Sequence, residues 1–278
     1  MALTTTDVPP ARAGAPAPIV LFLPAYDEEA AVGGVVARVP DHVCGHPVEC
    51  VVVDDGSTDR TAVVAAAAGA TVVSLDRNRG LGAAVRVGLA EGVRRGAAAV
   101  VFCDADGEYA PEELDALVRP ILAGDADYVV GSRFAGRIER MQPHRRLGNR
   151  VLTWALRRLA HRPITDGQSG YRALSLGAAT AAEIAHDFNY AQVLTLDLLG
   201  RGFRYHEVPI SYRFRETGTS FVHLGPYLRA VVPTVWRQWR AAYPGRPRRL
   251  GLLPRVVQSS TTWERNTSRA ADQELVSS

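Results

Sequence analysis

The chain has 278 residues, and 47% of them are hydrophobic, which is enough to bury one substantial core. All 32 of its basic residues are arginine, and the absence of lysine excludes a Walker-type phosphate loop and a Schiff-base enzyme. Residues 1–130 carry 9 Arg and 19 acidic residues, whereas residues 131–278 carry 23 Arg and 10 acidic residues, so the halves have net charges of −10 and +13. A basic half suits anionic partners, such as a diphosphate, a phospholipid surface or a nucleic acid.

The cysteine content and the hydropathy pattern indicate a cellular location. Cys44, Cys50 and Cys103 are too few and too irregularly spaced for a disulfide scaffold or a zinc site. The first residues show no charged and then apolar signal pattern, and no run of about 18 apolar residues occurs. We therefore expect a cytoplasmic protein whose membrane contact is peripheral, on the inner face of the cell membrane.

The ends of the chain differ from its centre. Residues 1–17 and 243–278 are rich in small and polar residues and in proline, without periodicity, which predicts disordered tails. Between them, strands alternate with helices, as in a doubly wound, mainly parallel α/β sheet flanked by helices, so we predict one domain over residues 18–242. The predicted strands are 19–23, 49–53, 70–74, 98–103 and 128–131, and the predicted helices are 28–39, 58–68, 81–95 and 111–122.

Polar residues follow the predicted strands, at the edge of the sheet where such folds bind ligands. Asp55 can accept hydrogen bonds from a nucleobase or a ribose, and Tyr26 can lie against the base. The alternative for these acidic residues is a turn and a helix cap, which we favour for Asp59 but not for Asp55. The segments that follow the first, second, fourth and fifth strands are Pro24-Ala25-Tyr26-Asp27-Glu28, Asp54-Asp55-Gly56-Ser57-Thr58-Asp59, Asp104-Ala105-Asp106 and Gly131-Ser132-Arg133.

The acidic segment after the fourth strand is a candidate metal site. Oxygen ligands on one loop suit Mg²⁺ or Mn²⁺, which keep coordination positions open for substrate phosphates, so Asp106, Glu108 and Asp104 predict binding of a nucleotide diphosphate. An EF-hand is excluded, because Tyr109 takes the place of its required glycine and a strand precedes the loop. The alternative is that these acids cap the next helix, which begins near Pro111.

A glycine-rich segment, residues 78–85, follows the third predicted strand. It is not a dinucleotide fingerprint, because Val85 stands where the third glycine belongs and the segment does not follow the first strand. Its glycines allow the backbone to turn into a helix close to a ligand, which makes Arg79 a candidate contact for a phosphate or a sugar. An ordinary tight turn is the alternative.

Further motifs follow the fifth strand, namely Asp166-Gly167-Gln168-Ser169-Gly170-Tyr171-Arg172, Glu207-Val208-Pro209-Ile210, and Arg215 with Gly218 and Ser220. Together with the strand-end segments and residues 78–82, this ordered set resembles family 2 glycosyltransferases of the GT-A fold, and most closely the dolichyl- or polyprenyl-phosphate mannose synthase group. The resemblance covers roughly residues 18–222. It implies a hexosyltransferase with a nucleotide-binding half, residues 18–130, and an acceptor-facing and membrane-facing half, residues 131–242.

The resemblance also implies roles for individual residues. In this family, the positions that surround the nucleoside correspond to Pro24, Tyr26, Glu28 and Asp55, and the metal and diphosphate motif corresponds to Asp104 and Asp106. The arginines that face the diphosphate or the acceptor phosphate correspond to Arg133, Arg172 and Arg215, and Ser220 belongs to the same substrate-binding set. The chain departs from the family at Glu108, where members often have Gln, and at Asn189 and Gln192, near which members commonly have Glu. These amides can bond a neutral group of the acceptor, cap the helix or face solvent.

The implied reaction moves a sugar from GDP-mannose or a UDP-hexose with inversion at the anomeric carbon. A divalent cation on Asp106, with Asp104 or Glu108, would stabilise the departing nucleoside diphosphate together with Arg133 and Arg215. A lipid monophosphate can attack unaided, whereas a hydroxyl acceptor needs a general base, for which Asp166 is the candidate. With a lipid acceptor, we expect Asp166 instead to position Arg172 or the backbone near Gly167 and Gly170.

Two basic amphipathic segments, 144–162 and 224–242, carry interfacial tryptophans and predict peripheral contact with an anionic membrane. The alternative is core packing with a solvated arginine face. We therefore expect a polyprenyl-phosphate acceptor, with a soluble hydroxyl acceptor as the second possibility. A basic module that binds anions or membranes without turnover is the non-enzyme alternative, and nucleic acid is not an expected partner, since the strand-end aspartates repel its phosphates.

Overall fold

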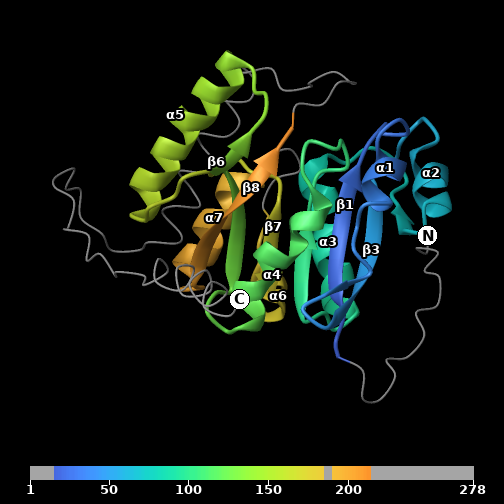
Figure 1. Ribbon diagram of the computed structural model, residues 1–278, viewed down its shortest axis with the longest axis horizontal. Coiled ribbons are helices and arrows are strands. Elements are labelled where there is room, and N and C mark those ends of the chain that lie inside the picture. The colour runs from blue at the N-terminus through green and yellow to red at the C-terminus, as the bar shows by residue number, and fades with distance from the viewer. Residues whose placement is uncertain (1–15, 185–189, 214–278) are drawn as a thin grey trace, which may run out of the picture. The chain divides into compact units, whose positions relative to one another are not determined.

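The computed structural model describes residues 16–184 and 190–213, and its elements are shown in Figure 1. The predicted tails, the second amphipathic segment, Arg215 and Ser220 lie outside the described residues, apart from residues 16 and 17, which have no regular structure. The strands are β1 Ile19–Ala25, β2 His42–Val43, β3 His46–Asp54, β4 Thr71–Ser74, β5 Ala99–Phe102, β6 Tyr128–Ile138, β7 Arg172–Ser175 and β8 Tyr205–Tyr212. The helices are α1 Val32–Val36, α2 Thr61–Ala67, α3 Leu81–Arg94, the 3₁₀ turn Pro111–Glu113, α4 Leu114–Leu122, α5 Pro143–Ala160, α6 Leu176–Ala181 and α7 Ala191–Gly200.

The strands form one mixed sheet in the order β2-β3-β1-β5-β7-β6-β8, and β4 also pairs with β3. β4, β3, β1 and β5 are mutually parallel, β6 and β8 are parallel, and β7 runs antiparallel to both β5 and β6. The prediction of a mainly parallel sheet flanked by helices is therefore confirmed. Because Arg172 at the start of β7 pairs with Phe102 at the end of β5, the loop before β7 lies beside the acidic loop after β5.

The pairing of β6 with β8 contains an irregularity near the same edge. Ser132 pairs with Pro209, and the next paired residues are Arg137 and Ser211, so the ladder shifts register over residues 133–136. A bulge of this kind bends a strand and turns its side chains to new directions. Arg133 is the first residue of this irregular stretch.

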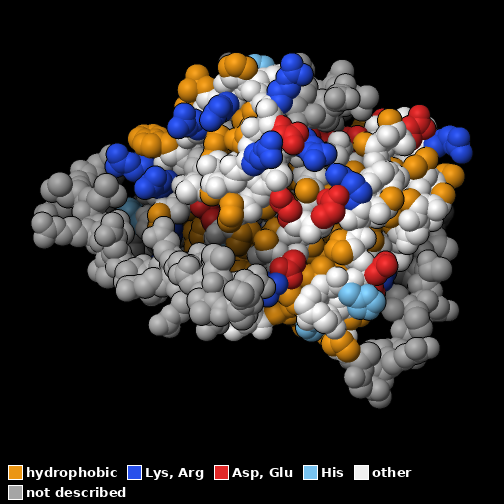
Figure 2. Space-filling model, in the orientation of Figure 1, with side chains coloured by type: hydrophobic (Ala, Val, Ile, Leu, Met, Phe, Trp, Pro, Cys, Tyr) orange, Lys and Arg blue, Asp and Glu red, His pale blue; other side chains and the backbone are white. Residues whose placement is uncertain are grey.

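Helix α5 packs against the domain with one face only. Thr153, Leu156 and Ala160 are buried, and the last two contact Ile164 and Leu196 in a small cluster of their own. At roughly 100° per residue, the opposite face carries three apolar side chains. These are Leu147, Val151 and Trp154, which are 65%, 55% and 60% exposed. Figure 2 shows arginine and apolar side chains interleaved over the region of α5.

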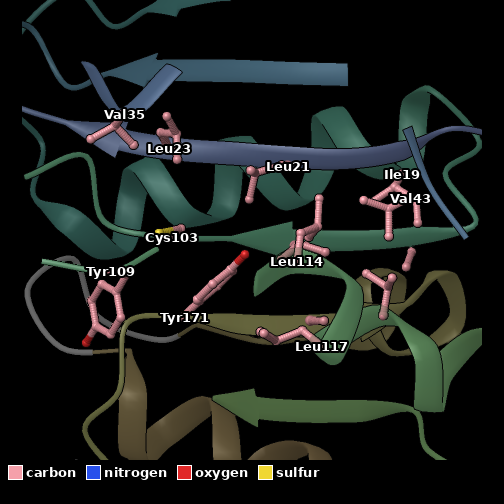
Figure 3. Packing of buried hydrophobic residues seen from close by; sticks show 14 of the residues in the cluster. Ile19, Leu21, Leu23, Val35, Val43, Cys103, Tyr109, Leu114, Leu117 and Tyr171 are labelled. Carbon is pink, nitrogen blue, oxygen red and sulfur yellow. The ribbon is translucent and has the colours of Figure 1, made fainter. Parts of the chain in front are cut away.

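The two faces of the sheet bury separate cores, because successive residues of a strand point to opposite faces. Ile19, Leu21 and Leu23 of β1 contact α1 and α4, and Figure 3 shows this cluster extending to Tyr109 and Tyr171 beside the strand ends. Val20 and Phe22 contact α3 on the other face. α3 approaches so closely that a Cβ on Gly88 would lie 2.1 Å from the Phe22 ring.

Several predicted boundaries were wrong by a few residues. The helix predicted over 28–39 is only α1 Val32–Val36, because residues 27–29 instead bond to the loop after β3. The helix predicted over 58–68 begins at Thr61, and its N-cap residue is Arg60 and not Asp59, although the Asp59 carboxylate accepts from the Thr61 N–H at 2.9 Å. The strand predicted over 128–131 continues to Ile138. Among the described residues, no helix is both long enough and apolar enough to cross a bilayer.

Candidate active site

The loops that follow β1 and β3 are bonded to each other. The Asp27 carboxylate accepts from the Thr58 N–H at 2.7 Å, and the Asp27 N–H donates to the Ser57 hydroxyl at 3.0 Å. The Glu28 N–H donates to the Thr61 hydroxyl at 2.8 Å. Three of the predicted nucleoside-binding residues are on this rim, where Pro24 is buried and Tyr26 and Glu28 are partly buried. Their contact with a nucleoside stays a prediction.

Asp55 holds the loop that precedes α3. Its buried carboxylate accepts from the backbone N–H groups of Arg79 and Gly80, both at 2.8 Å. The Arg79 side chain is exposed and pairs with Asp76 at 2.8 Å. An open pocket of about 520 Å³ adjoins the loop and is lined by Leu75, Arg77, Asn78, Arg79, Ala83, Arg86 and Val87. Asp55 therefore orients the glycine-rich loop, and its bond to a base or a ribose stays a prediction.

The acidic loop after β5 concentrates negative charge. Burial raises the pKa of Asp104 and of Asp106 above the ordinary aspartate value, and the nearby charges of Glu108 and Glu28 raise both further. Asp106 turns its own loop by accepting from the Glu108 N–H at 3.0 Å. Since nearby carboxylates disfavour the charged forms of Asp104 and Asp106, a divalent cation at this place would be stabilising.

Glu108, one of the three predicted metal ligands, is engaged by protein groups. Arg145 from the first turn of α5 donates to its carboxylate at 3.2 Å, and the Tyr212 hydroxyl donates at 2.7 Å. Within residues 16–184 and 190–213, no three His, Cys, Asp or Glu side chains come together as a metal centre. Asp104 and Asp106 therefore remain the candidate ligands, and the Glu108 carboxylate links the acidic loop to α5 and β8.

Gly170 is the contact between the acidic loop and the loop before β7. A Cβ at this position would lie 2.2 Å from Asp104 Oδ2, so any side chain would displace the carboxylate. The Gly170 N–H donates to the Tyr109 hydroxyl at 2.8 Å. Tyr109 lies in the core seen in Figure 3, and its contact with the loop before β7 was not predicted from the sequence. Its place directly after the acidic loop was the available signal.

Arg133 and Asp166 form a buried ion pair. Arg133 Nε and Nη2 donate to the two carboxylate oxygens at 2.7 and 2.9 Å, and the Arg133 N–H donates at 3.1 Å. The Arg133 and Asp166 side chains are only 5% and 0% exposed. The guanidinium also lies over the Tyr212 ring, 5.2 Å from its centre, and its charge partly offsets the rise in the pKa of Asp104 that burial causes. The ion-pair partner of Asp166 is therefore Arg133 and not Arg172, whereas its bond from the Gln168 N–H, at 3.1 Å, agrees with the other expectation, that Asp166 positions the backbone near Gly167 and Gly170.

Arg172 is fully buried beneath the loop of residues 165–170. Its guanidinium donates to the carbonyl oxygens of Ser169, Gly167 and Ala191, and to the hydroxyls of Tyr128 and Thr195. The guanidinium also lies over the rings of Tyr128 and Tyr190, so in this arrangement Arg172 supports the loop. A direct contact with a phosphate, as predicted, would require it to exchange some of these partners.

Gln192 is 3% exposed in α7, a helix with almost every side chain buried.

The edge of the sheet brings together Asp104, Asp106, Arg133 and Asp166, while Arg172 is buried under the loop of residues 165–170. Preorganised cations beside paired carboxylates, on an α/β sheet at the carboxyl ends of its strands, are suited to binding and transferring groups attached to a diphosphate.

Comparison with known proteins identifies the class. The family model described as Glycosyl transferase family 2 matches residues 20–179. The chain belongs to this family, and it is a glycosyltransferase of the GT-A fold, as the motifs predicted.

Similar proteins differ in the acceptor that their names give. The polyprenol monophosphomannose synthase of Mycolicibacterium smegmatis is 35% identical over 72% of this chain and 79% of its own length. The undecaprenyl-phosphate mannosyltransferase of Micrococcus luteus is 30% identical over 84% of this chain and 99% of its own length. The crystal structure of glucosyl-3-phosphoglycerate synthase from Mycobacterium tuberculosis with Mn²⁺, UDP-glucose and phosphoglyceric acid has a TM-score of 0.66 and 28% identity, with 80% of this chain and 79% of that chain covered.

Proposed function

We propose that this glycosyltransferase moves a hexose from a nucleotide-diphosphate sugar to a polyprenyl phosphate, with Mg²⁺ or Mn²⁺ bound at the acidic loop. The names of two relatives, a polyprenol monophosphomannose synthase and an undecaprenyl-phosphate mannosyltransferase, support this acceptor. Similar crystal structures that contain UDP with Mn²⁺ or Mg²⁺ support the donor and the metal. GDP-mannose and UDP-hexoses are the donors to test.

The acidic loop fits a divalent ion. Asp104 and Asp106 would hold it, since Mg²⁺ commonly takes one or two carboxylates and completes its coordination with substrate phosphates and water. The excess negative charge at this loop is the observation that favours such an ion. When bound, the ion would neutralise charge on the leaving diphosphate.

The protein's own groups act around that charge. Arg133 is fixed by Asp166 and stacked on Tyr212, so its guanidinium is oriented before substrate binds. A preorganised cation in a partly dry site stabilises developing negative charge without having to reorganise. The loop after β1, clasped to the loop after β3, would hold the nucleoside, with Tyr26 against the base and Asp55 beside it.

The ion pair of Asp166 favours an acceptor that needs no general base. A carboxylate that is 0% exposed and bound to Arg133 through two oxygens is poorly placed to take a proton from a hydroxyl. A lipid monophosphate is already anionic near neutral pH. Its phosphate oxygen can therefore attack the anomeric carbon directly, from the face opposite the leaving group, which inverts the configuration.

The apolar outer face of α5 is the single observation that carries the lipid assignment. Packing against α7 accounts for the buried face of the helix, but not for Leu147, Val151 and Trp154 on the opposite side. The helix sequence contains five arginines and no acidic residue. An exposed apolar stripe flanked by arginines suits the interface of an anionic bilayer. Because Arg145, in the first turn of the same helix, bonds to Glu108, the N-terminal end of α5 lies beside the acidic loop.

Vesicle sedimentation tests the membrane contact. Wild-type protein should sediment with vesicles of mixed neutral and anionic phospholipids and much less with neutral vesicles, while Trp154→Ser and Val151→Ser should weaken binding about tenfold each. Val63→Ser is the matched control, since Val63 is another exposed valine, 58% exposed on α2. Equal binding by all four proteins would show that the apolar outer face of α5 does not contact the membrane.

The activity is tested by supplying acceptors in parallel. Purified protein is incubated with radiolabelled GDP-mannose or UDP-hexoses, Mg²⁺ or Mn²⁺, and either undecaprenyl phosphate or phosphoglyceric acid. We expect labelled product that extracts into organic solvent, that is lost with EDTA and that requires the lipid. Labelled product only in the aqueous phase would assign the second candidate, a soluble acceptor, which the solved complexes with phosphoglyceric acid favour.

A further inference from the structure

Glu207 in β8 has no part in the chemistry above, yet its carboxylate accepts several hydrogen bonds. It accepts from the Thr165 N–H at 2.9 Å, from the Thr165 hydroxyl at 2.6 Å and from the Asp166 N–H at 3.2 Å. The Tyr205 hydroxyl, also on β8, donates to it at 2.6 Å. One side chain thus fixes the start of the loop that carries Asp166.

Strand pairing does not hold Arg133 in place. The regular ladder between β6 and β8, which lie side by side in Figure 1, stops at Ser132 and Pro209 and resumes at Arg137. Pro209 has no N–H to donate across this gap. Arg133 is the first residue of the irregular stretch, so its direction must come from other contacts.

Side-chain bonds connect the two strands at this gap. The Ser132 and Thr165 hydroxyls lie 2.6 Å apart, and the Asp166 carboxylate binds both the backbone and the guanidinium of Arg133. The Glu207 carboxylate accepts hydrogen bonds from the N–H groups of these same two residues, Thr165 and Asp166. A continuous path of contacts therefore runs from β8 through this loop to the guanidinium.

We propose that Glu207 is a positioning residue for Arg133, acting through Asp166. This rests on the proposed function, in which Arg133 stabilises the charge on the departing nucleoside diphosphate. A carboxylate is needed because every described partner of Glu207 is a donor, and a carboxylate offers only acceptors. A glutamine would place an NH₂ group against one of these donors.

The substitution Glu207→Gln keeps the size of the side chain and tests this role. We expect kcat to fall roughly tenfold to a hundredfold, because charge-assisted hydrogen bonds are lost and the guanidinium is misplaced. The KM for the nucleotide sugar should change by less than about threefold, since the loops after β1 and β3 are untouched. Glu139→Gln is the matched control. Glu139 is partly exposed, 3.6 Å from Arg213, and should tolerate the change.

A double-mutant cycle separates positioning from general stability. Arg133→Ala should lower kcat by itself, and adding Glu207→Gln to it should lower kcat by less than about twofold more. A merely structural role of Glu207 would instead reduce kcat by the same factor in both backgrounds. That result, or a wild-type kcat for Glu207→Gln, would overturn the proposal.

A spectroscopic readout decides the matter independently of turnover. The Nε–H signal of Arg133, assigned by its loss in Arg133→Lys, should shift and exchange faster with water in Glu207→Gln. The Nε–H signal of Arg95, which is buried and donates to Glu91 at 3.3 Å in the other half of the chain, should stay unchanged as an internal reference. If wild-type protein turned over no nucleotide sugar, the proposed function would fail, and an unmoved Arg133 signal would still overturn the positioning role by itself.

Discussion

The acidic and basic halves of the chain use their charges in different ways. In residues 18–130, acids at the strand ends accept from backbone N–H groups of neighbouring loops, as Asp27 does from Thr58 and Asp55 does from Arg79. In residues 131–213, Arg133 and Arg172 are buried and hold a loop, whereas the arginines along the outer part of α5 are exposed. The comparison teaches that the charges fall into two groups. The buried arginines and the acids at the strand ends align the loops of the candidate site, whereas the exposed arginines make α5 a basic helix.

One of the contacts between the two halves, that of Gly170 with Asp104, gives the largest expected effect. Gly170→Ala would place a Cβ 2.2 Å from Asp104 Oδ2 and displace the carboxylate that we propose as a metal ligand. We expect release of nucleoside diphosphate to fall by about a hundredfold or more. Gly177→Ala is the control, because only Ser175 Oγ, at 4.0 Å, would lie near its Cβ. An active Gly170→Ala enzyme would show that the position of Asp104 does not matter.

Buried and exposed arginines can also be compared by stability. Arg133→Met leaves the Asp166 carboxylate buried without its ion-pair partner, and we expect a loss of about 3 kcal/mol in the free energy of unfolding. Arg119→Met breaks an exposed pair with Asp115 on α4, and should cost less than about 0.5 kcal/mol. Urea unfolding of both variants measures the difference. Similar losses for both would contradict the distinction drawn between the two kinds of arginine.

The smallest expected effect concerns the three thiols, all in the acidic half. Burial raises the pKa of Cys50 to about 12 and that of Cys103 well above its ordinary value. A raised pKa means less of the reactive thiolate at pH 8. Partial burial and the hydrogen bond to Asp115, at 3.0 Å, raise the pKa of Cys44 as well, but Cys44, at the turn between β2 and β3, is the one exposed thiol of the three. Iodoacetamide should therefore modify only Cys44 in the folded protein at pH 8. Mass spectrometry that finds Cys103 modified first would contradict this burial pattern.

Much of the fold was predictable because strand residues and strand-end residues carry local signals. The apolar run before Asp104 predicted β5, and polar segments after each strand predicted the edge that holds the site. The insertion of β7 between β5 and β6 was not predicted. β7 is only four residues long, and its pairing depends on partners distant in sequence.

The site was predictable in its acids and less so in its arginines. Asp104 and Asp106 are neighbours in sequence, so one strand end delivers both. The partner of Asp166 lies 33 residues away, and geometry chose Arg133 over the nearer Arg172. Glu108 is likewise bonded to Arg145, 37 residues away, and Glu207 to a loop 42 residues away. Such pairs follow from tertiary packing, which no local pattern encodes.

The most direct test of the account measures metal-dependent release of nucleoside diphosphate from the preferred nucleotide sugar in the presence of polyprenyl phosphate. Wild-type protein should release nucleoside diphosphate, and the release should stop when EDTA is added. Asp106→Asn should be slower by about a hundredfold or more. Asp125→Asn, at an exposed position after α4, should match wild type. An Asp106→Asn protein that turns over at the wild-type rate, with chelator present, would contradict the account.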